Sequence, residues 1–390
     1  MQKSQIVWAD LAVKAQYSAF VPAFEEQSVG EYHVMMHIES RDDSFTEQMN
    51  RLLVAERRLL ESQPFDGASI VIKRFILSDV ANQKPVIQKL LSESSDCGCH
   101  AAVSMIQQAP LDGSKMVVWL YLVKGADVNL QKNVTKVCHN GYHHLFQWGL
   151  VELMGDSYHQ TQKLLERYES TLESHGATIE ANCIRTWFYV RDVDTQYAGL
   201  VKARKENFET HGLTEKTHYI ASTGIGGIPA EQQAIVQLGS YALIGFEPRQ
   251  RKFLYGTSHM NPTYEYGVTF ERGTVVEYGD RSHLYISGTA SINNKGEVMY
   301  EGDIKRQTER MIENVEVLLA EGYASFNDVA QMIVYLRDMA DYKVVKDIVD
   351  RKCPAIPKVF TLAPVCRPTW LIEMECIAIT PRKNEKYRNF

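Results

Sequence analysis

The chain has 390 residues, of which 45% are hydrophobic and 23% charged, and its formal net charge is −6. This length predicts two or three units of about 100–150 residues each. The acidic balance disfavours nucleic-acid binding, because proteins of that class neutralise phosphates with a basic face. The seven cysteines are an odd and scattered set, which predicts a reducing compartment and no disulfide framework.

Neither a leader peptide nor a membrane span is expected. Asp10, Lys14 and Gln16 interrupt the apolar residues near the N-terminus. The longest apolar stretch, 116–123, is far shorter than the ~20 residues that a membrane-spanning helix needs. We therefore expect a cytoplasmic protein that binds neither a membrane nor a nucleic acid.

Two groups of potential metal ligands are visible, a Cys-Gly-Cys-His run at 97–100 and three histidines within 139–144. Their spacing matches no zinc-binding pattern. We expect no metal and no cofactor.

Three segments, 44–79, 157–192 and 303–338, share one layout. They have the same length, so they align without a gap, and such self-similarity is the mark of an internal repeat. Apolar residues recur at matching positions, namely Leu52, Leu165 and Met311, then Leu59, Leu172 and Leu318, and then Phe75, Phe188 and Val334.

Each segment is predicted to open with a helix. Ser44, Ser157 and Asp303 are suitable N-cap residues. Gly176 and Gly322 stand where a left-handed C-cap is expected. The third segment shows the apolar spacing of an amphipathic helix most clearly.

Strands and a second helix complete each copy. β-branched and aromatic residues predict strands at 70–77, 183–190 and 330–337. A second helical stretch, such as 342–349, follows Asp79, Asp192 and Asp338. Each copy closes with an apolar strand, at 116–123, 234–244 and 370–379. An opening hairpin fits before each first helix, most clearly at 283–292.

The predicted unit is β-β-α-β-α-β, an α+β (two-layer α/β) arrangement with helices on one face of a mixed sheet. We expect the first unit at 1–130, the second at 131–247, and the third, which holds the active site, at 278–380. The stretch 248–277, rich in aromatic residues, Gly and Pro, is interpreted as an inserted loop over a site. A tail occupies 381–390.

The third unit resembles the Rid/YjgF family, also labelled endoribonuclease L-PSP or translation initiation inhibitor. The motifs that carry the resemblance are Tyr285-Ile-Ser-Gly288, 307–314 and Arg367 followed by 372–378. Members have a chorismate mutase-like fold and are homotrimers with sites between subunits. The resemblance therefore implies an intrachain pseudo-trimer, either monomeric or assembled into a higher homo-oligomer.

A narrower resemblance is to the chorismatases, which hydrolyse chorismate on the same fold. It covers about 180–380 and is carried by Arg185-Thr-Trp-Phe-Tyr189 with Asp192, by 221–226, by 288–292, and by Cys366-Arg367 with 371–373; Arg249-Gln250 also fits. Chorismatases have an arginine in the loop after a Tyr-Gly pair, whereas 266–270 of this chain has none. The implied substrate is a small carboxylic acid.

Glu373 and Glu375 are the strongest candidates for catalysis. Side chains alternate along a strand, so both carboxylates share one face of an apolar strand, where an unused charge is costly. The closing strands of the first two copies carry no acid. We expect Glu373 to be the acid/base, with its pKa raised by desolvation, and Glu375 a supporting neighbour. The alternative is a salt-bridged pair at a sheet edge.

Arg367 and Cys366 lie just upstream of that strand. A guanidinium binds a carboxylate in a bidentate way, and the Rid resemblance implies that role for Arg367, with a surface arginine as the alternative. Cys366 is interpreted as lining the pocket. A nucleophilic role is less favoured, because the motif indicates no histidine partner.

Backbone and strand residues complete the candidate substrate-binding set. Backbone N–H groups at Gly288, Thr289 and Ala290, and at Gly224 in the second copy, could hold a substrate oxygen; a tight turn is the alternative. Arg185 and Tyr189 share a strand face that could line the pocket opposite Glu373, or could simply pack at an interface.

Three functions remain open on this basis. The first is a hydrolase or lyase of the chorismatase or enamine/imine deaminase type. The second is a regulatory protein that binds a small acid without reacting it. The third, an endoribonuclease or translation inhibitor, is disfavoured by the acidic balance.

Overall fold

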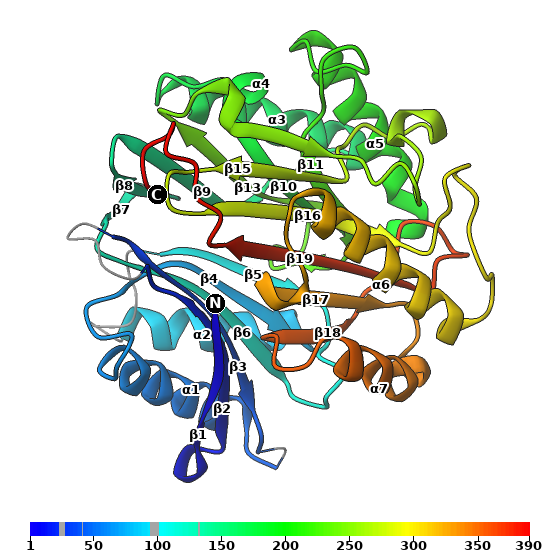
Figure 1. The fold of residues 1–390 in the computed structure, drawn as a ribbon. Coiled ribbons are helices and arrows are strands. Elements are labelled where there is room, and N and C mark those ends of the chain that lie inside the picture. Colours follow the sequence, from blue (N-terminus) through cyan, green and yellow to red (C-terminus); the bar gives the residue numbers. More distant parts are fainter. Residues whose placement is uncertain (23–27, 41, 94–100, 132) are drawn as a thin grey trace.

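A computed structural model describes residues 1–22, 28–40, 42–93, 101–131 and 133–390. It has three β-sheets that face one another, with helices on their outer sides (Figure 1). The Cys-Gly-Cys-His run at 97–100 lies outside the described residues. Among the described residues no cluster of three or more metal-ligating side chains occurs. No helix in the described chain is long and apolar enough to cross a membrane.

The first sheet has the order β1-β2-β3-β6-β4-β5 and is extended by β12 of the following unit. Its elements are β1 (Gln2–Trp8), β2 (Val13–Phe20), β3 (Gly30–Ile38), α1 (Phe45–Leu60), β4 (Ser69–Leu77), α2 (Val80–Glu93), β5 (Ala102–Gln107) and β6 (Met116–Lys124).

The second sheet has the order β11-β10-β13-β9-β8-β7. Its elements are β7 (Asp127–Gln131), β8 (Val134–His139), β9 (Tyr142–Val151), α3 (Ser157–Glu173), α4 (Ile179–Asn182), β10 (Cys183–Val190), α5 (Val193–Thr210), β11 (Ala221–Gly226), β12 (Ile228–Pro229, which joins the first sheet) and β13 (Val236–Ile244).

The third sheet has the order β14-β15-β16-β19-β17-β18. Its elements are β14 (Arg251–Leu254), β15 (Gly273–Glu277), β16 (Ser282–Ala290), α6 (Ile304–Glu321), β17 (Val329–Leu336), α7 (Tyr342–Lys352), β18 (Lys358–Leu362) and β19 (Ile372–Thr380).

The α+β fold class and the threefold repeat are confirmed, but the unit contains two more strands than predicted. One is a leading strand (β1, β7 or β14), and the other pairs in parallel with the central strand after the second helix (β5, β11 or β18). β14 and β15 also lie within the stretch interpreted as an inserted loop, so only 255–272 connects strands there. These strands are short, and pairing with neighbours rather than local sequence stabilises them.

Two of the predicted helix ends were wrong. The N-cap of α3 is Asp156, not Ser157, and its side chain accepts from the His159 N–H. Gly322 ends α6 with an ordinary φ of −83°, while Tyr323 adopts the positive φ of 60°. A Cβ at Gly322 would collide with Leu284, so packing rather than backbone conformation requires glycine there.

The three units contact one another in a cyclic pattern. Three β-bridges join the stretch before one unit's closing strand to the parallel strand of the preceding unit: Pro229 to Ile106, Val365 to Ile225, and Pro110 to Thr361. Because the third bridge links the first unit back to the third, the cycle closes. The chain is therefore an intrachain pseudo-trimer.

The inward faces of the three sheets form one apolar core. Trp119 of the first unit and Trp148 and Trp187 of the second are buried there, with ring centroids 6.0 Å and 4.7 Å apart. Alternate residues of β6, such as Val118 and Leu120, face α1 and α2 in a separate outer cluster. This alternation places β19 side chains of one face at the junction of the units.

Candidate active site

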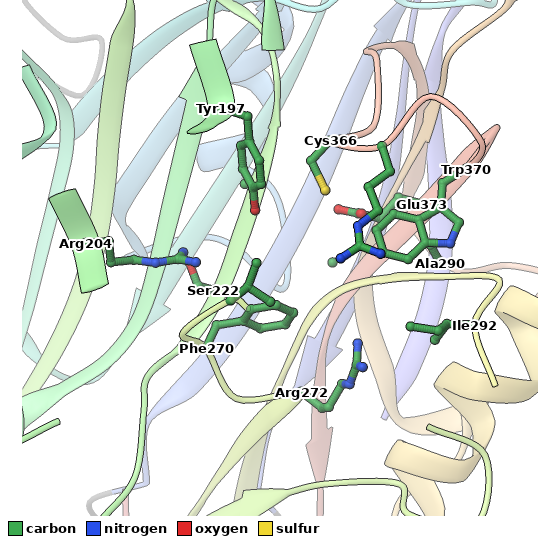
Figure 2. A pocket seen from close by; sticks show the side chains of 14 residues that line it. Tyr197, Arg204, Ser222, Phe270, Arg272, Ala290, Ile292, Cys366, Trp370 and Glu373 are labelled. Atoms are coloured by element: carbon green, nitrogen blue, oxygen red, sulfur yellow. The ribbon is translucent and has the colours of Figure 1, made fainter. Parts of the chain in front are cut away.

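A cavity of about 530 Å³, including its open mouth, lies between the second and third units (Figure 2). The second unit contributes α5 and β11; the third contributes the 255–272 connection, β16, β19 and the loop before β19. The polar and aromatic lining residues are Tyr197, Arg204, Ser222, Phe270, Arg272, Cys366, Arg367, Trp370 and Glu373.

Glu373 lies on a central strand, not at a sheet edge, because β19 pairs with β16 on one side and β17 on the other. The residue is 5% exposed, and its carboxyl has no hydrogen-bond partner among the residues that the structure describes. Burial, and then the charge of Glu375, raise the pKa of Glu373 to about 8, while Arg185 and Arg272 oppose the shift. Glu373 is therefore poised to donate a proton near neutral pH.

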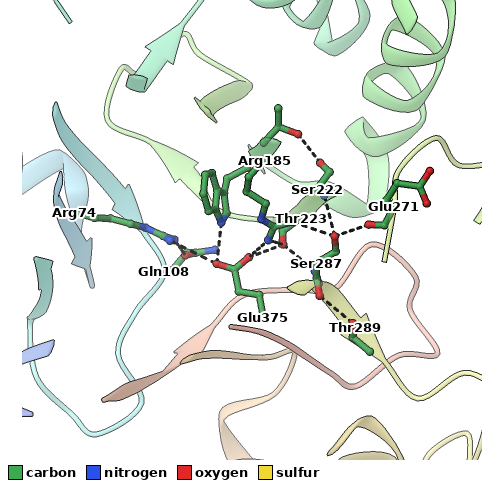
Figure 3. Close-up of polar contacts among 12 residues, drawn as sticks. Arg74, Gln108, Arg185, Ser222, Thr223, Glu271, Ser287, Thr289 and Glu375 are labelled. Carbon is green, nitrogen blue, oxygen red and sulfur yellow. Dashed lines mark hydrogen bonds and ion pairs between the residues drawn. The ribbon is translucent and has the colours of Figure 1, made fainter. Parts of the chain in front are cut away.

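Glu375 is held by groups from both other units (Figure 3). Arg185 Nη2 and the Thr223 hydroxyl donate to its Oε2 at 3.0 and 2.5 Å, and Trp187 Nε1 donates to its Oε1 at 3.1 Å. Arg74 Nη1 of the first unit lies 4.0 Å away. Glu375 thus fixes the junction of the three units and places a negative charge beside Glu373.

Three arginines converge on the cavity from separate elements. Arg204, on α5, donates to the hydroxyls of Thr269 and Ser222 at 3.2 and 3.4 Å. Arg272, just before β15, donates to the Asn261 carbonyl at 3.0 Å. Arg367, in the loop before β19, lies over the Trp370 ring at 4.9 Å. Glu373 is the only acid in the described lining, so the cavity favours anions.

Cys366 lies close to Tyr197 and Glu373 (Figure 2). Burial, and then the neighbouring Glu373, raise the pKa of the Cys366 thiol to about 12. The thiolate is the nucleophilic form of cysteine, and a thiol with this pKa is protonated at neutral pH. The geometry therefore favours the pocket-lining interpretation.

Gly288 and Gly224 were expected to offer backbone N–H groups to a substrate oxygen, but the structure gives them a different role. The Gly288 N–H donates to the Thr223 hydroxyl at 2.9 Å, so it is not available to a substrate oxygen. Gly288 instead makes room, because a Cβ there would overlap the Glu373 carboxylate. Gly224 gives similar room to the Tyr197 ring.

The other predicted residues divide into two groups. Ala290 lines the cavity, whereas Thr289 is buried elsewhere and its hydroxyl donates to the Ser287 carbonyl. Arg185 and Tyr189 do not line the cavity. Arg185 serves Glu375, and Tyr189 packs under the Arg74 guanidinium at 4.6 Å, so the interface alternative describes them.

Sequence reasoning missed Arg204, Arg272 and Tyr197. Arg272 lies two residues beyond the 266–270 stretch in which an arginine was sought, so a search allowing a shift in position would have found it. Arg204 and Tyr197 lie on a helix with no distinctive motif. Their role follows only from the contact between units.

Comparison with known proteins identifies the family. The protein-family model for endoribonuclease L-PSP matches residues 274–380 of this chain. A RutC family protein of Pyrococcus abyssi is 34% identical over 97 residues, which are 24% of this chain and 76% of that protein. The chain belongs to the Rid family, the group of the RutC and L-PSP proteins. The Rid-family match covers the strands that carry Gly288 and Glu373 and the loop of Arg367.

Longer but weaker similarity extends into the second unit. A 3-hydroxybenzoate synthase of Streptomyces hygroscopicus is 25% identical over 223 residues, or 51% of this chain and 64% of that protein. A crystal structure of chorismatase matches with a TM-score of 0.63 and 17% identity, covering 81% of this chain and 95% of that one. At this identity the likeness establishes the fold, and it confirms the predicted resemblance of the fused Rid units to that structure.

Proposed function

We propose that the protein releases pyruvate from chorismate or a close enol-ether analogue. The observation that carries the proposal is the placement of one protonated carboxyl, Glu373, in a cavity with three arginines. Chorismate has two carboxylates and an enol ether that is cleaved after protonation of its terminal carbon. A carboxyl that keeps its proton at neutral pH suits that step.

The charge of the cavity supports a substrate with more than one carboxylate. Arg204, Arg272 and Arg367 bring three guanidinium groups to its lining. Arg204 and Arg272 are almost fully buried, which strengthens their attraction for an anion because water screens it less. Each guanidinium presents paired donors that match the two oxygens of a carboxylate.

The proposed reaction begins with transfer of the Glu373 proton to the enolpyruvyl methylene. The double-bond electrons form the new C–H bond, and the adjacent ether oxygen stabilises the resulting cation. Water then attacks the cationic carbon that bears the ether oxygen and returns a proton to the Glu373 carboxylate. The hemiketal collapses to pyruvate and a ring alcohol, so one water is consumed and the carboxyl is restored. Glu375 favours this return, since two neighbouring carboxylates repel each other.

The ring product distinguishes two outcomes of the same protonation. Hydrolysis gives a dihydroxycyclohexadiene carboxylate, whereas loss of pyruvate with aromatisation gives 3-hydroxybenzoate and consumes no water overall. The similarity to a 3-hydroxybenzoate synthase supports looking for the aromatic acid. Pyruvate is released on both routes.

The test is to incubate the purified chain with chorismate, follow pyruvate with lactate dehydrogenase and NADH, and separate ring products by chromatography. We expect pyruvate and one ring product in equal amounts, and we expect release of both to fall about 10³-fold with Glu373→Gln. A rate no higher than spontaneous chorismate decay would exclude chorismate as the substrate.

A second candidate is an enamine/imine deaminase, supported by Glu373 and Arg367, which occupy the positions that the Rid resemblance implies. An imine with a single carboxylate offers one anionic group to a cavity that three arginines line. Ammonia release from an imine generated in situ by an amino acid oxidase tests it. Stabilisation by carboxylic acids without either product would instead indicate the binding-only protein.

A further inference from the structure

A second cavity, of about 770 Å³ including its open mouth, lies between the third and first units. The first unit lines it with β2 and β3, and the third lines it with α7 and β18. In the pseudo-threefold repeat, β2 and β3 correspond to β15 and β16, and α7 and β18 correspond to α5 and β11. The active-site cavity is lined by α5, β11, β16 and the segment just before β15. The second cavity is therefore the same kind of seam with different side chains.

The register of the sheets shows which side chains changed. Val117 pairs with His37 as Glu373 pairs with Ala290, so Val117 occupies the position of the acid and His37 that of Ala290. β10 and β17 have equal lengths, and continuing their register into the next helix puts Asp350 in the position of Arg204. This seam lacks a counterpart of the Glu373 carboxyl at its strand position.

His37 forms a dyad with Asp112 on the wall of this cavity. The two side chains are 3.1 Å apart from Nδ1 to Oδ2, and Asp112 also accepts from Ser114 at 2.9 and 2.6 Å. Although burial opposes it, these hydrogen bonds hold the pKa of Asp112 well below its usual range. Asp112 thereby fixes the imidazole orientation and directs Nε2 away from itself. That Nε2 is buried and has no hydrogen-bond partner in the described structure.

Lys14 stands directly opposite His37 on the neighbouring strand. No hydrogen bond or ion pair holds the Lys14 ammonium among the described residues, whereas Lys346 and Lys358 are both occupied by Asp350 at 2.5 and 2.9 Å. Lys14 and His37 thus project two nitrogen-bearing side chains from the same face of neighbouring strands.

The opposite wall is partly aromatic. The Tyr342 and Phe360 rings pack edge to face with centroids 5.6 Å apart, and both line the cavity. An aromatic wall facing two nitrogen donors is typical of a site for a molecule with an apolar body and one anionic end.

We propose that this cavity is a second ligand site, which binds a small ring-bearing carboxylate without reacting it. The carboxylate bridges the Lys14 ammonium and His37 Nε2–H, and Asp112 holds the other ring nitrogen, Nδ1, at 3.1 Å. The ring lies against Phe360 and Tyr342. With Val117 in the position of the acid, the ligand leaves as it entered.

Benzoate titrated by calorimetry into the full chain tests the proposal. Arg272→Met and Arg367→Met are combined in the background to remove binding at the active-site cavity. We expect one saturable site for benzoate and none for benzamide, which lacks the charge. Absence of a saturable site, or equal affinity for benzamide, overturns the proposal, and phosphate binding as tightly as benzoate overturns the need for a ring.

Variants of the dyad locate the site. His37→Asn keeps a donor toward Asp112 but removes the atom at Nε2, whereas His37→Gln keeps a donor near Nε2. We expect at least a tenfold loss of benzoate affinity in His37→Asn and in Lys14→Met, and a smaller loss in His37→Gln. Glu39→Gln, an exposed change at the same cavity, is the matched control and should bind normally. Unchanged binding in Lys14→Met, with folding checked by circular dichroism, contradicts the assignment.

Chorismate turnover separates this inference from the proposed function. His37→Asn and Lys14→Met are expected to release pyruvate at the normal rate, because neither residue lines the active-site cavity. Loss of turnover in either variant would mean that the two cavities are one functional unit and would overturn the separate site.

Discussion

The three seams of the pseudo-trimer are built on one backbone plan but differ in chemistry. At the seam between the second and third units, Glu373 faces three arginines. At the seam between the third and first units, Val117 replaces the acid. At the remaining seam Gln237 occupies that position and donates to the Ser104 hydroxyl at 3.0 Å. The backbone repeat therefore sets where a cavity can form, and one position on the closing strand sets whether that strand brings a carboxyl group to it.

The seam that holds Glu373 also buries a cluster of ions. Glu375 is buried with Arg185 and Arg74, and ions removed from water are stable only when their partners are complete. The corresponding residue of the first unit is Trp119, and that of the second is Gly239. The seam between the third and first units buries a cluster of its own, in which Glu31 lies 2.6 Å from Arg281 and 2.8 Å from His283, so a buried ion cluster does not by itself mark the seam of Glu373.

Glu373→Gln should have the largest effect of the variants considered, because it removes the acid that distinguishes this seam from the other two. The amide preserves shape but cannot give up a proton in the same way, so we expect chorismate turnover to fall about 10³-fold with little change in substrate affinity. The measurement is pyruvate release at saturating chorismate. Glu39→Gln, the same change at the second cavity, serves as the control, and a comparable loss there would abolish the distinction between the seams.

Glu375→Gln should reduce stability most. The substitution leaves Arg185 and Arg74 buried without their anion, which is expected to lower the free energy of unfolding by about 3–5 kcal/mol. Urea denaturation followed by circular dichroism measures it. Asp194→Asn breaks the half-exposed pair with Arg337 and should cost below about 1 kcal/mol. Equal losses in both variants would show that the buried cluster contributes nothing special.

Arg272→Met should weaken substrate binding without disturbing the acid. Removing one buried guanidinium from a carboxylate-binding cavity is expected to raise KM about 10- to 100-fold, because a charge-assisted bidentate contact contributes roughly 1.5–3 kcal/mol. Steady-state kinetics with chorismate measure it. Arg272→Lys should recover only part of the loss, since an ammonium cannot present the paired donors. Full recovery would mean that charge alone matters there.

Much of the fold could be predicted because the repeat supplies three views of one pattern. The first helix of each copy begins within one residue of the expected position, and the closing strands lie where predicted. The leading strands and the strands after the second helices were missed. They are short and take their conformation from neighbours that sequence distance conceals.

The site was predictable only on the side of the third unit. Glu373, Arg367 and Cys366 lie close together in sequence and carry a recognisable motif, and the structure brings them to one cavity. Arg204 and Arg272 come from a helix and from a connection whose proximity depends on how two units meet. Arg185 was predicted to line the pocket because its side chain lies on the inward face of its strand. It instead donates a hydrogen bond to the Glu375 carboxylate.

The smallest effect, and the one that most directly probes the electrostatics of the active seam, is on the pH profile. Burial and the Glu375 charge raise the pKa of Glu373 from 4.5 to about 8, so the proton donor is intact below that pH. We expect kcat/KM to be flat toward neutral pH and to fall about tenfold per pH unit above about 8. The free energy of unfolding should also decrease with rising pH, because the folded state binds the Glu373 proton more tightly than the unfolded state does. The decrease should extend from about pH 4.5 to about pH 8.

Comparison of variants tests whether the fall of kcat/KM at alkaline pH, the alkaline limb of the profile, belongs to Glu373. The stability decline should vanish in Glu373→Gln, which has no proton to lose. In Glu375→Gln the alkaline limb should move to lower pH, because the like charge that disfavours ionisation of Glu373 is gone while Arg185 remains. A limb that stays in place in Glu375→Gln would assign the titration to a different group and remove the electrostatic argument for Glu373 as the proton donor.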